Sequence, residues 1–571
     1  MPETIPADVP VKVLVARNRA FLPDDDGPLV AIFPDQNTWN DYGRNFFAKL
    51  HVRPSAGDPV NLHMRLMFEG RSKSFSVFSE LFETHGTVFN IADVDVPFAS
   101  LLTDIDDYRK VIEALGFEAG VSALRKLHDA AVARIEQNDS VVLGLIDSEE
   151  FHIGALRNGG AYDAIRRGNR YFRPDMPPEN KDAAIDFVFG ARLPSAQNLY
   201  TLKFRFDREE PFRDRASVLI GRNGVGKTQL LAAMVSGLRA DWEGFGPKPR
   251  FCPPIRPTRV LVFSSVPTDP FPRSIGAWHG IDYEYFAVNA SDDSDDSLLV
   301  ALVTCKKSDE RSGFGENRDQ SRMDVIREAI KPIGLWRHLH LPLRKRRAGD
   351  ELPDVQEIDG ESFFLLGQNL NELNLIRLIQ QIDWSRAPVV LDDEMRPRKL
   401  SSGEYAMLRF AAQAAAAIEP GSLLLLDEPE THLHPNFISD MMEILDSLLQ
   451  STNSIAIIAT HSAYVVRETP RRRVNILSIK DDVIRIDTPR MQTFGATIDS
   501  ISQFVFQDTA ISHRFQKTLA RWADDVGPEL GIEGVIERYG EHLNTESLSF
   551  IARHLQEDKD DDAEESNDTA L

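Results

Sequence analysis

Short apolar runs beyond residue 215 indicate the strands of a buried parallel sheet. They cover residues 216–220, 423–426 and 455–459, and the second run is four consecutive leucines. A strand without polar positions is buried on both faces, which is typical of parallel sheets covered by helices. Residues 229–238 favour a helix after the first run, and residues 260–264 indicate a further core strand. The pattern therefore predicts an α/β domain.

The first 195 residues have a different pattern, and we recognise no catalytic motif in them. Residues 46–52 and 60–68 indicate a hairpin whose second strand places four side chains on one face: Leu62, Met64, Leu66 and Phe68. Residues 106–137 have helical spacing, and residues 140–146 indicate a further strand. These patterns predict an N-terminal α+β domain, whose role the sequence does not reveal.

Three later regions differ from the α/β pattern. Residues 280–395 mix short helical and polar stretches, which indicates a helical lobe inserted into the α/β domain. Residues 491–555 are largely helical in pattern. Residues 556–571 are rich in Asp and Glu and have almost no apolar content, a composition that cannot bury a core and that predicts disorder.

Composition limits the functional classes. The chain has 571 residues, which is too long for one compact domain, and a formal net charge of −23, which opposes a role in coating nucleic acid. Basic clusters at residues 344–347 and 471–473 have two interpretations, a local contact to DNA or ordinary solvated charge. The only cysteines, Cys252 and Cys305, indicate neither a disulfide framework nor a zinc site. No apolar run or signal peptide indicates a membrane or secreted protein, so we expect a cytoplasmic one.

A glycine-rich stretch between the first apolar run and its helix predicts a phosphate-binding loop. Its glycines let the backbone wrap a polyphosphate, Lys227 would reach the β- and γ-phosphates, and the Thr228 hydroxyl would ligate Mg²⁺. Phe204, Phe206 and Phe212 are candidates for stacking on the base, and the sequence does not choose among them. The predicted nucleotide-binding residues are Gly221, Arg222, Asn223, Gly224, Val225, Gly226, Lys227, Thr228 and Gln229.

Two carboxylates follow the run of leucines, and a histidine follows the next strand. Ligands of parallel sheets bind at the carboxyl ends of the strands. Adjacent residues of a strand point in opposite directions, so Asp427 and Glu428 are expected to do different work. Asp427 is placed to hold Mg²⁺ through its water shell and Glu428 to polarise the attacking water. His461 is placed to contact the γ-phosphate.

These motifs, together with the stretch Leu-Ser-Ser-Gly-Glu at residues 400–404, resemble the ABC-type ATPase family, including its soluble SMC-like and OLD-like branches. Ser402 stands where the family signature has a glycine, residue 404 is Glu where it has Gln, and residues 262–266 contain no glutamine of the kind that usually follows that strand. The resemblance implies ATP and Mg²⁺ as ligands, with Glu428 as the catalytic glutamate and His461 as the switch histidine.

The resemblance also implies an oligomer. In the family, the signature of one subunit closes over the nucleotide in another, so Ser401, Ser402 and Gly403 would bind nucleotide in trans, and ATP would hold two heads together. The implied fold class is α/β: an ABC-type P-loop ATPase head with an inserted helical lobe. The expected domains are residues 1–195 (α+β), 196–490 (ATPase, with the lobe at 280–395), 491–555 (helical) and 556–571 (acidic tail).

The segment Glu-Thr-His-Leu-His-Pro at residues 430–435, and more weakly residues 490–496, resemble Septu-type (PtuA-like) anti-phage defence ATPases. The leading interpretation is a switch that dimerises, or forms a higher even-numbered oligomer, through its heads and controls a separate effector such as an HNH-type nuclease. One alternative is an OLD-like enzyme with its own nuclease domain, for which the residues after 490 are too few and too helical. Others are an SMC-like clamp on DNA and a transporter subunit.

Overall fold

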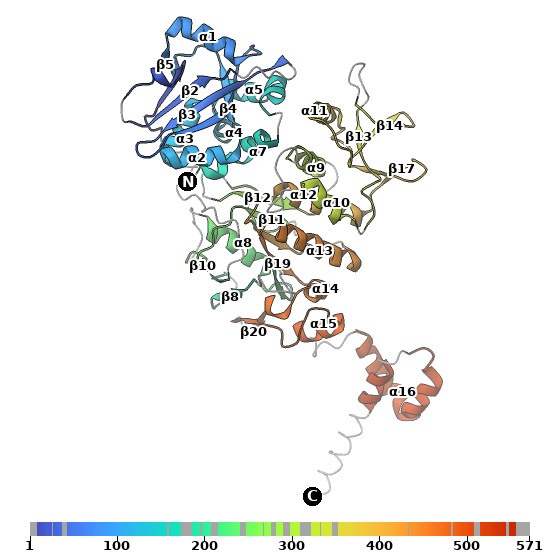
Figure 1. The fold of residues 1–571 in the computed structure, drawn as a ribbon. Helices are drawn as coiled ribbons and strands as arrows, with labels where there is room; N and C mark the ends of the chain where they lie inside the picture. The colour runs from blue at the N-terminus through green and yellow to red at the C-terminus, as the bar shows by residue number, and fades with distance from the viewer. Residues whose placement is uncertain are drawn as a thin grey trace. The chain divides into compact units, whose positions relative to one another are not determined.

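The computed structural model describes residues 8–24, 27–36, 43–156, 159–172, 186–193, 197–206, 215–239, 247–265, 268–275, 281–288, 297–308, 321–331, 333–344, 352–431, 433–480, 483–506, 514–543 and 547–555. The predicted acidic tail at 556–571 lies outside these ranges. The chain forms two compact units, Met1–Ala496 and Thr497–Leu571 (Figure 1). The predicted fold class, an α/β P-loop head with flanking α+β and helical regions, is confirmed.

The N-terminal region is built on a six-stranded sheet in the order β5-β1-β2-β3-β4-β6. The predicted hairpin is present, because β3 and β4 pair antiparallel with Val52 opposite Val60. The strands are β1 Lys12–Ala16, β2 Leu29–Pro34, β3 Phe47–Arg53, β4 Val60–Phe68, β5 Val88–Asn90 and β6 Phe98–Leu102. The helices are α1 Ser74–His85, α2 Ile105–Leu115, α3 Phe117–Lys126, α4 Ala130–Glu136, α5 Ser140–Ile146, α6 Glu149–Gly154 and α7 Gly159–Arg167.

The prediction of a strand at residues 140–146 is wrong, since this stretch is helix α5. The Asp139 carboxylate accepts hydrogen bonds from the backbone N–H groups of Val141 and Val142, which satisfies donors that a helix start leaves without partners. Val142, Leu145 and Ile146 are buried at helical spacing. A capping residue and a helical burial pattern therefore outweigh the β-branched composition of the segment.

The ATPase region is organised by a seven-stranded sheet in the order β12-β11-β18-β19-β9-β20-β21, parallel except for β21. The strands predicted from the apolar runs are all present as β9, β11, β18 and β19. The bounds are β9 Ala216–Gly221, β11 Val260–Ser264, β12 Tyr283–Ala287, β18 Leu423–Asp427, β19 Ile455–Thr460, β20 Val474–Lys480 and β21 Val483–Asp487. The carboxyl ends of β18, β19 and β9 are therefore neighbours at one edge.

Helices cover both faces of this sheet. On one face, α8 (Lys227–Leu238) packs under a small antiparallel sheet formed by β7 (Phe187–Ala191), β8 (Tyr200–Phe204) and β10 (Arg250–Cys252). Val262 belongs to that core, and the adjacent Phe263 points to the opposite face, where its ring lies 5.2 Å from that of Phe410 in α12. Helices α12 (Ser402–Ala417), α13 (Pro435–Ser451) and α14 (Ala463–Arg467) complete the domain.

The inserted lobe contains helices, as expected, and also a sheet that the sequence pattern did not predict. Its helices are α9 Ser297–Ser308, α10 Arg322–Ala329 and α11 Glu372–Gln381. The sheet has the order β14-β15-β13-β16-β17, with β13 Leu339–Leu343, β14 Val355–Ile358, β15 Glu361–Leu365, β16 Val389–Leu391 and β17 Pro397–Lys399. Strands of three to five residues show too little alternation to be recognised.

The second unit is a small helical body. It contains α15 (Ile498–Phe506) and α16 (Arg514–Tyr539), which bends at Gly531, where φ is +61°. Its core includes Ala523, Val535 and Ile551. None of the helices that the structure describes is both long enough and apolar enough to cross a bilayer.

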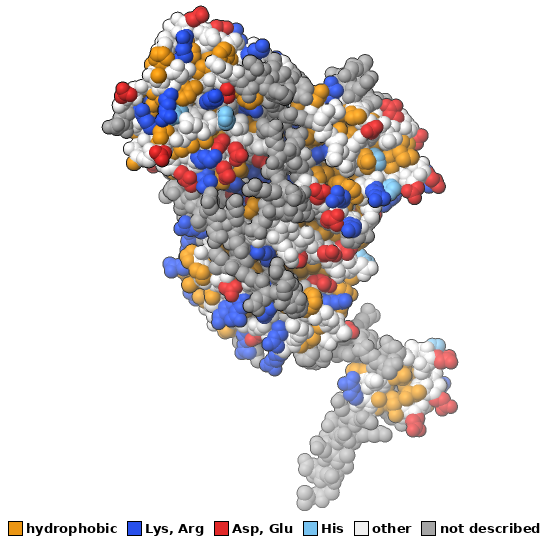
Figure 2. Space-filling model, viewed as in Figure 1, with side chains coloured by type: hydrophobic (Ala, Val, Ile, Leu, Met, Phe, Trp, Pro, Cys, Tyr) orange, Lys and Arg blue, Asp and Glu red, His pale blue; other side chains and the backbone are white. Residues whose placement is uncertain are grey.

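Figure 2 shows charged side chains of both signs on one face of the molecule, with Lys and Arg more frequent toward its lower left.

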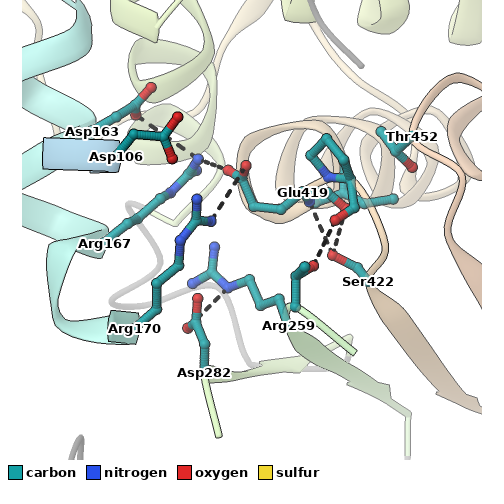
Figure 3. A network of polar contacts seen from close by, with 12 residues as sticks. Asp106, Asp163, Arg167, Arg170, Arg259, Asp282, Glu419, Ser422 and Thr452 are labelled. Carbon is teal, nitrogen blue, oxygen red and sulfur yellow. Dashed lines mark hydrogen bonds and ion pairs between the residues drawn. The ribbon is translucent and has the colours of Figure 1, made fainter. Parts of the chain in front are cut away.

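Three arginines bind the C-terminal end of helix α12, and Figure 3 shows two of them, Arg167 and Arg259, near Glu419, which lies just beyond this end. The side chain of Arg167, at the end of α7, donates to the carbonyl oxygen of Ala416. Arg259 donates to the carbonyl of Ala417 at 2.7 Å, and Arg322 donates to that of Ile418 at 3.0 Å. A helix leaves its last carbonyls without partners and carries partial negative charge there, so cations stabilise this end.

Glu419 follows this helix and is the common anion of the arginine cluster, which we define as Arg167, Arg170, Arg259 and Arg322. Arg167 contacts its carboxylate directly, Arg322 lies at 3.1 Å and Arg170 at 3.7 Å. Burial alone would raise the pKa of Glu419, but the charges of the arginines outweigh it and lower that pKa to about 2. The N-terminal domain, the lobe and the ATPase core therefore meet at the end of α12.

Candidate functional site

The phosphate loop lies between β9 and α8, and its glycines are required by the backbone. A Cβ atom on Gly221 would lie 2.4 Å from the carbonyl oxygen of Leu477 in β20, closer than packed atoms approach. Gly224 and Gly226 have φ values of +86° and +88°, which side chains with a Cβ disfavour. Gly226 is also the N-cap of α8. The glycines therefore allow a tight turn whose N–H groups precede a helix.

The other loop residues divide between core and surface. Val225 is buried and packs into the core, whereas Arg222, Asn223 and Gln229 are exposed. Lys227 is buried, and its ammonium group donates to the carbonyl oxygens of Gly221 at 2.9 Å and of Arg222 at 3.3 Å. Burial lowers the pKa of Lys227, and this effect is opposed mainly by the negative charge of Glu428. The amine thus lies inside the loop.

Thr228 and Asp427 are joined directly, although they are far apart in the sequence. The Thr228 hydroxyl donates to Asp427 Oδ1 at 3.0 Å. Asp427 is fully buried at the end of β18, and its Oδ2 has no hydrogen-bond partner among the described atoms. Burial raises the pKa of Asp427 to about 7 despite the bond from Thr228. A hydroxyl beside a buried carboxylate with an open oxygen fits Mg²⁺, a hard cation that prefers oxygen ligands.

Glu428 and His461 form the second contact of the site. Glu428 has φ of +50°, the left-handed region that is strained for a residue with a side chain and that recurs at functional sites. Its Oε1 lies 3.3 Å from Nδ1 of His461, which follows β19. The structure thus brings Asp427 to Thr228 and Glu428 to His461, so the two adjacent carboxylates have different partners.

The stretch at residues 400–404 forms hydrogen bonds within the first turn of α12. Ser401 is the N-cap of α12, where its hydroxyl accepts from Glu404 N at 3.4 Å, and Glu404 Oε2 accepts from Ser401 N at 2.7 Å. Arg398 holds the Glu404 carboxylate with two bonds of 3.0 Å, which lowers the pKa of Glu404 to about 2. The Glu at position 404 is therefore a capping residue. Ser401 and Ser402 are exposed.

Gly403 has a packing role within the chain. A Cβ atom at this position would lie 2.8 Å from the ring of Phe437 in α13. The glycine therefore lets α12 approach α13 closely, whether or not a nucleotide is bound.

The burial of side chains bears on two predictions from the sequence, the aromatic residue that stacks on the base and the basic cluster at residues 471–473. Phe204 and Phe206 are packed in the core at 1% and 5% exposure, so neither stacks on a base in this conformation, and Phe212 lies outside the described residues. The side chain of Arg473 is buried, and that of Arg471 donates to the Arg490 carbonyl oxygen at 3.0 Å. Arg471 and Arg472 are exposed, so a contact to DNA through these two residues stays a prediction, and residues 345–347 are outside the described ranges.

The sequence reasoning missed Glu430 and Thr460. Glu430 is buried, three residues beyond Asp427, and accepts a hydrogen bond from the Thr460 hydroxyl at the end of β19. The sequence does show Glu430 as a third acidic residue shortly after a buried strand. Its contact could not be predicted, because its partner Thr460 lies on the neighbouring strand.

Replacing Gly221 by alanine should destabilise the protein by about 1–3 kcal/mol, the usual cost of overpacking, because the new methyl group would overlap the Leu477 carbonyl. The midpoint of urea unfolding measures the loss. Gly190→Ala is the matched control, since a Cβ there would meet its neighbour Leu199 at an ordinary 3.8 Å. Equal midpoints for Gly221→Ala and wild type would contradict the close approach of β9 to β20.

Comparison with known proteins gives one family match and several distant relatives. Residues 216–467 match the sequence model of the family described as "AAA domain, putative AbiEii toxin, Type IV TA system". Protein ea59 of Escherichia phage lambda is 23% identical over 562 residues, covering 94% of this chain and 95% of that protein. The family match spans the phosphate loop, residues 400–404, both carboxylates of the site and His461.

Two of the solved structures that match this chain have low sequence identity to it. The protein cbiO1 from Clostridium perfringens, part of the ABC transporter complex cbiONQ, matches 62% of this chain and 99% of its own at 14% identity, with a TM-score of 0.26. The SMC head domain from Thermotoga maritima matches 53% of this chain and 98% of its own at 12% identity, also with a TM-score of 0.26.

Proposed function

We propose that this chain, which carries an AAA-type P-loop ATPase domain over residues 216–467, is an ABC-type nucleotide switch that binds and hydrolyses ATP, dimerises through its ATPase heads and controls a partner effector. The observation that supports it best is the bond from Thr228 to Asp427, which joins the phosphate loop to the carboxylate pair. Lys227 lies in the same loop, and Glu428 and His461 are in contact beside it.

The arrangement assigns a task to each residue. The loop N–H groups and Lys227 bind the phosphates, and Thr228 and Asp427 would hold Mg²⁺, which neutralises charge on the phosphate oxygens. Glu428 is the general base, because it follows the metal-binding carboxylate and is partly exposed, so it can polarise the attacking water. His461 lies against Glu428 and contacts the γ-phosphate.

The start of α12 supports head closure. Ser401 and Ser402 are exposed there, and the N-terminal end of a helix attracts anions. Arg398 offsets the negative charge of Glu404 at this position. The opposite end of α12 is bound by the arginine cluster, which includes Arg167 of the N-terminal domain. This helix therefore offers a route by which closure over ATP would reach the N-terminal domain.

Light scattering of the Glu428→Gln variant tests head closure. With ATP and Mg²⁺ the mass should double, because ATP that is bound but not hydrolysed holds two heads together. Adding Ser402→Arg should prevent the doubling while ATP binding persists. The matched control is Ser76→Arg, which places arginine at an exposed position in the first turn of α1. A mass that ATP leaves unchanged in Glu428→Gln would overturn the closure model.

The effector in this proposal is a separate nuclease, and the setting is cytoplasmic defence against phage. Residues 430–435 support this assignment by their resemblance to Septu-type ATPases. The isolated chain should not cut DNA. Robust metal-dependent cleavage by the purified chain alone would contradict a separate effector.

A further inference from the structure

Glu430 lies behind the site, although no step assigned so far uses it. The chain turns sharply after β18, with Glu428 in the left-handed region and Thr431 N donating to the Glu428 carbonyl at 3.1 Å. This turn brings the Glu430 carboxylate to the end of β19, where its Oε1 accepts from the Thr460 hydroxyl. The side chain of Glu430 is only 5% exposed.

The hydrogen bonds of Thr460 fix the orientation of this carboxylate. The backbone N–H of Ser462 donates to Thr460 Oγ1 at 2.8 Å, so the hydroxyl proton is directed to Glu430. The same oxygen, Glu430 Oε1, lies 3.8 Å from Nδ1 of His461. Burial raises the pKa of Glu430, and the bond from Thr460 opposes this effect.

His461 therefore lies near two carboxylates that differ in exposure. Its Nδ1 is 3.3 Å from Glu428 and 3.8 Å from Glu430, and the Glu428 side chain is 23% exposed against 5% for Glu430. A carboxylate oxygen that accepts an imidazole N–H is a weaker base toward water, because the bond stabilises its charged form. Glu428 therefore acts better on the water when Glu430, the second carboxylate near Nδ1, holds the imidazole.

We propose that Glu430 is a positioning residue of the ATPase site, which holds Nδ1 of His461 so that Nε2 faces the γ-phosphate and Glu428 is left to act on the water. The inference rests on the proposed function of Glu428 and His461. It follows the general arrangement in which a catalytic base is oriented by a third group.

The remaining oxygen of Glu430 argues against a role in packing alone. Glu430 Oε2 is buried and has no hydrogen-bond partner among the described atoms. A buried polar atom without a partner is costly, and such atoms recur where function requires them.

A double-mutant cycle on the full chain tests the proposal by the kcat and KM of ATP hydrolysis. Glu430→Ala should lower kcat by about 10–100-fold, the usual loss when an orienting partner is removed, and should leave KM unchanged. In the His461→Ala background the same substitution should have no further effect, because its target is gone. Glu430→Gln keeps the accepting oxygen and should retain most of the wild-type kcat.

Other outcomes distinguish a failure of this proposal from a failure of the proposed function. Equal losses from Glu430→Ala with and without His461 would show a structural role and overturn the proposal, as would full activity of His461→Ala. Should Glu430→Ala fail to fold, the cycle is run with Glu430→Met, which fills the space but does not accept the N–H in place of the carboxylate, and whose loss of kcat must then depend on His461. Glu443→Ala, an exposed glutamate of α13, is the matched control. A wild type without ATP hydrolysis, or Glu428→Gln with full activity, would instead overturn the proposed function.

Discussion

Replacing Glu428 by glutamine should lower kcat for ATP hydrolysis by about 10²–10⁴-fold, the usual contribution of a general base. Glutamine has the shape of glutamate but cannot act as a base. It is long enough to keep the contact with His461. Binding of ATP should be unchanged, because Lys227 and the loop N–H groups hold the phosphates. Phosphate release under steady-state conditions measures kcat, and a fluorescent ATP analogue measures binding.

The exposed residue Glu443 of α13 provides a matched control, since Glu443→Gln makes the same chemical change away from the site. Lys227→Ala complements the test, because it should weaken binding itself. Hydrolysis by Glu428→Gln at the wild-type rate would show that another group activates the water, and the assignment of Glu428 would then be wrong.

Replacing Glu419 by alanine should reduce the free energy of unfolding by about 3–5 kcal/mol, the usual cost of removing one partner of a buried ion pair. The substitution leaves Arg167, Arg170 and Arg322 facing one another without their common anion. The midpoint of urea unfolding, followed by circular dichroism, measures the loss. Glu80→Ala is the control, because Glu80 pairs with Arg71 at 2.9 Å on the surface and should contribute at most about 1 kcal/mol.

The same residue makes the stability depend on pH in a defined range. The folded-state pKa of Glu419 is about 2, below its ordinary value of 4.5. Its contribution is therefore fully present above pH 4.5 and is lost as pH falls through about 2; the shift corresponds to about 3 kcal/mol. The difference in stability between wild type and Glu419→Gln should shrink over this range. A difference that stays constant from pH 6 to pH 2 would contradict the lowered pKa.

Local patterns were sufficient for the strands that carry the site. A buried parallel strand is an unbroken apolar run, and the residue after it lies at the edge of the sheet where ligands bind. The sequence predicted in this way that Asp427, Glu428 and His461 lie at this edge, and the structure places them there. The glycine pattern likewise predicted the loop beside Lys227 and Thr228, and the roles of these residues stay predictions. The prediction of a strand at residues 140–146 was wrong because their composition favours a strand, whereas the Asp139 cap and the spacing of the buried side chains favour a helix.

The sequence alone thus determined which residues end the central strands and which loop can wrap a phosphate, because these are properties of consecutive residues. Only the tertiary structure decided that Glu430 meets Thr460 and that Glu419 meets Arg167, since each pair lies on separate elements. It also decided that Phe204 and Arg473 are buried. Such contacts depend on how helices and strands pack against each other. No single segment of the sequence specifies that packing through its charge or its residue spacing.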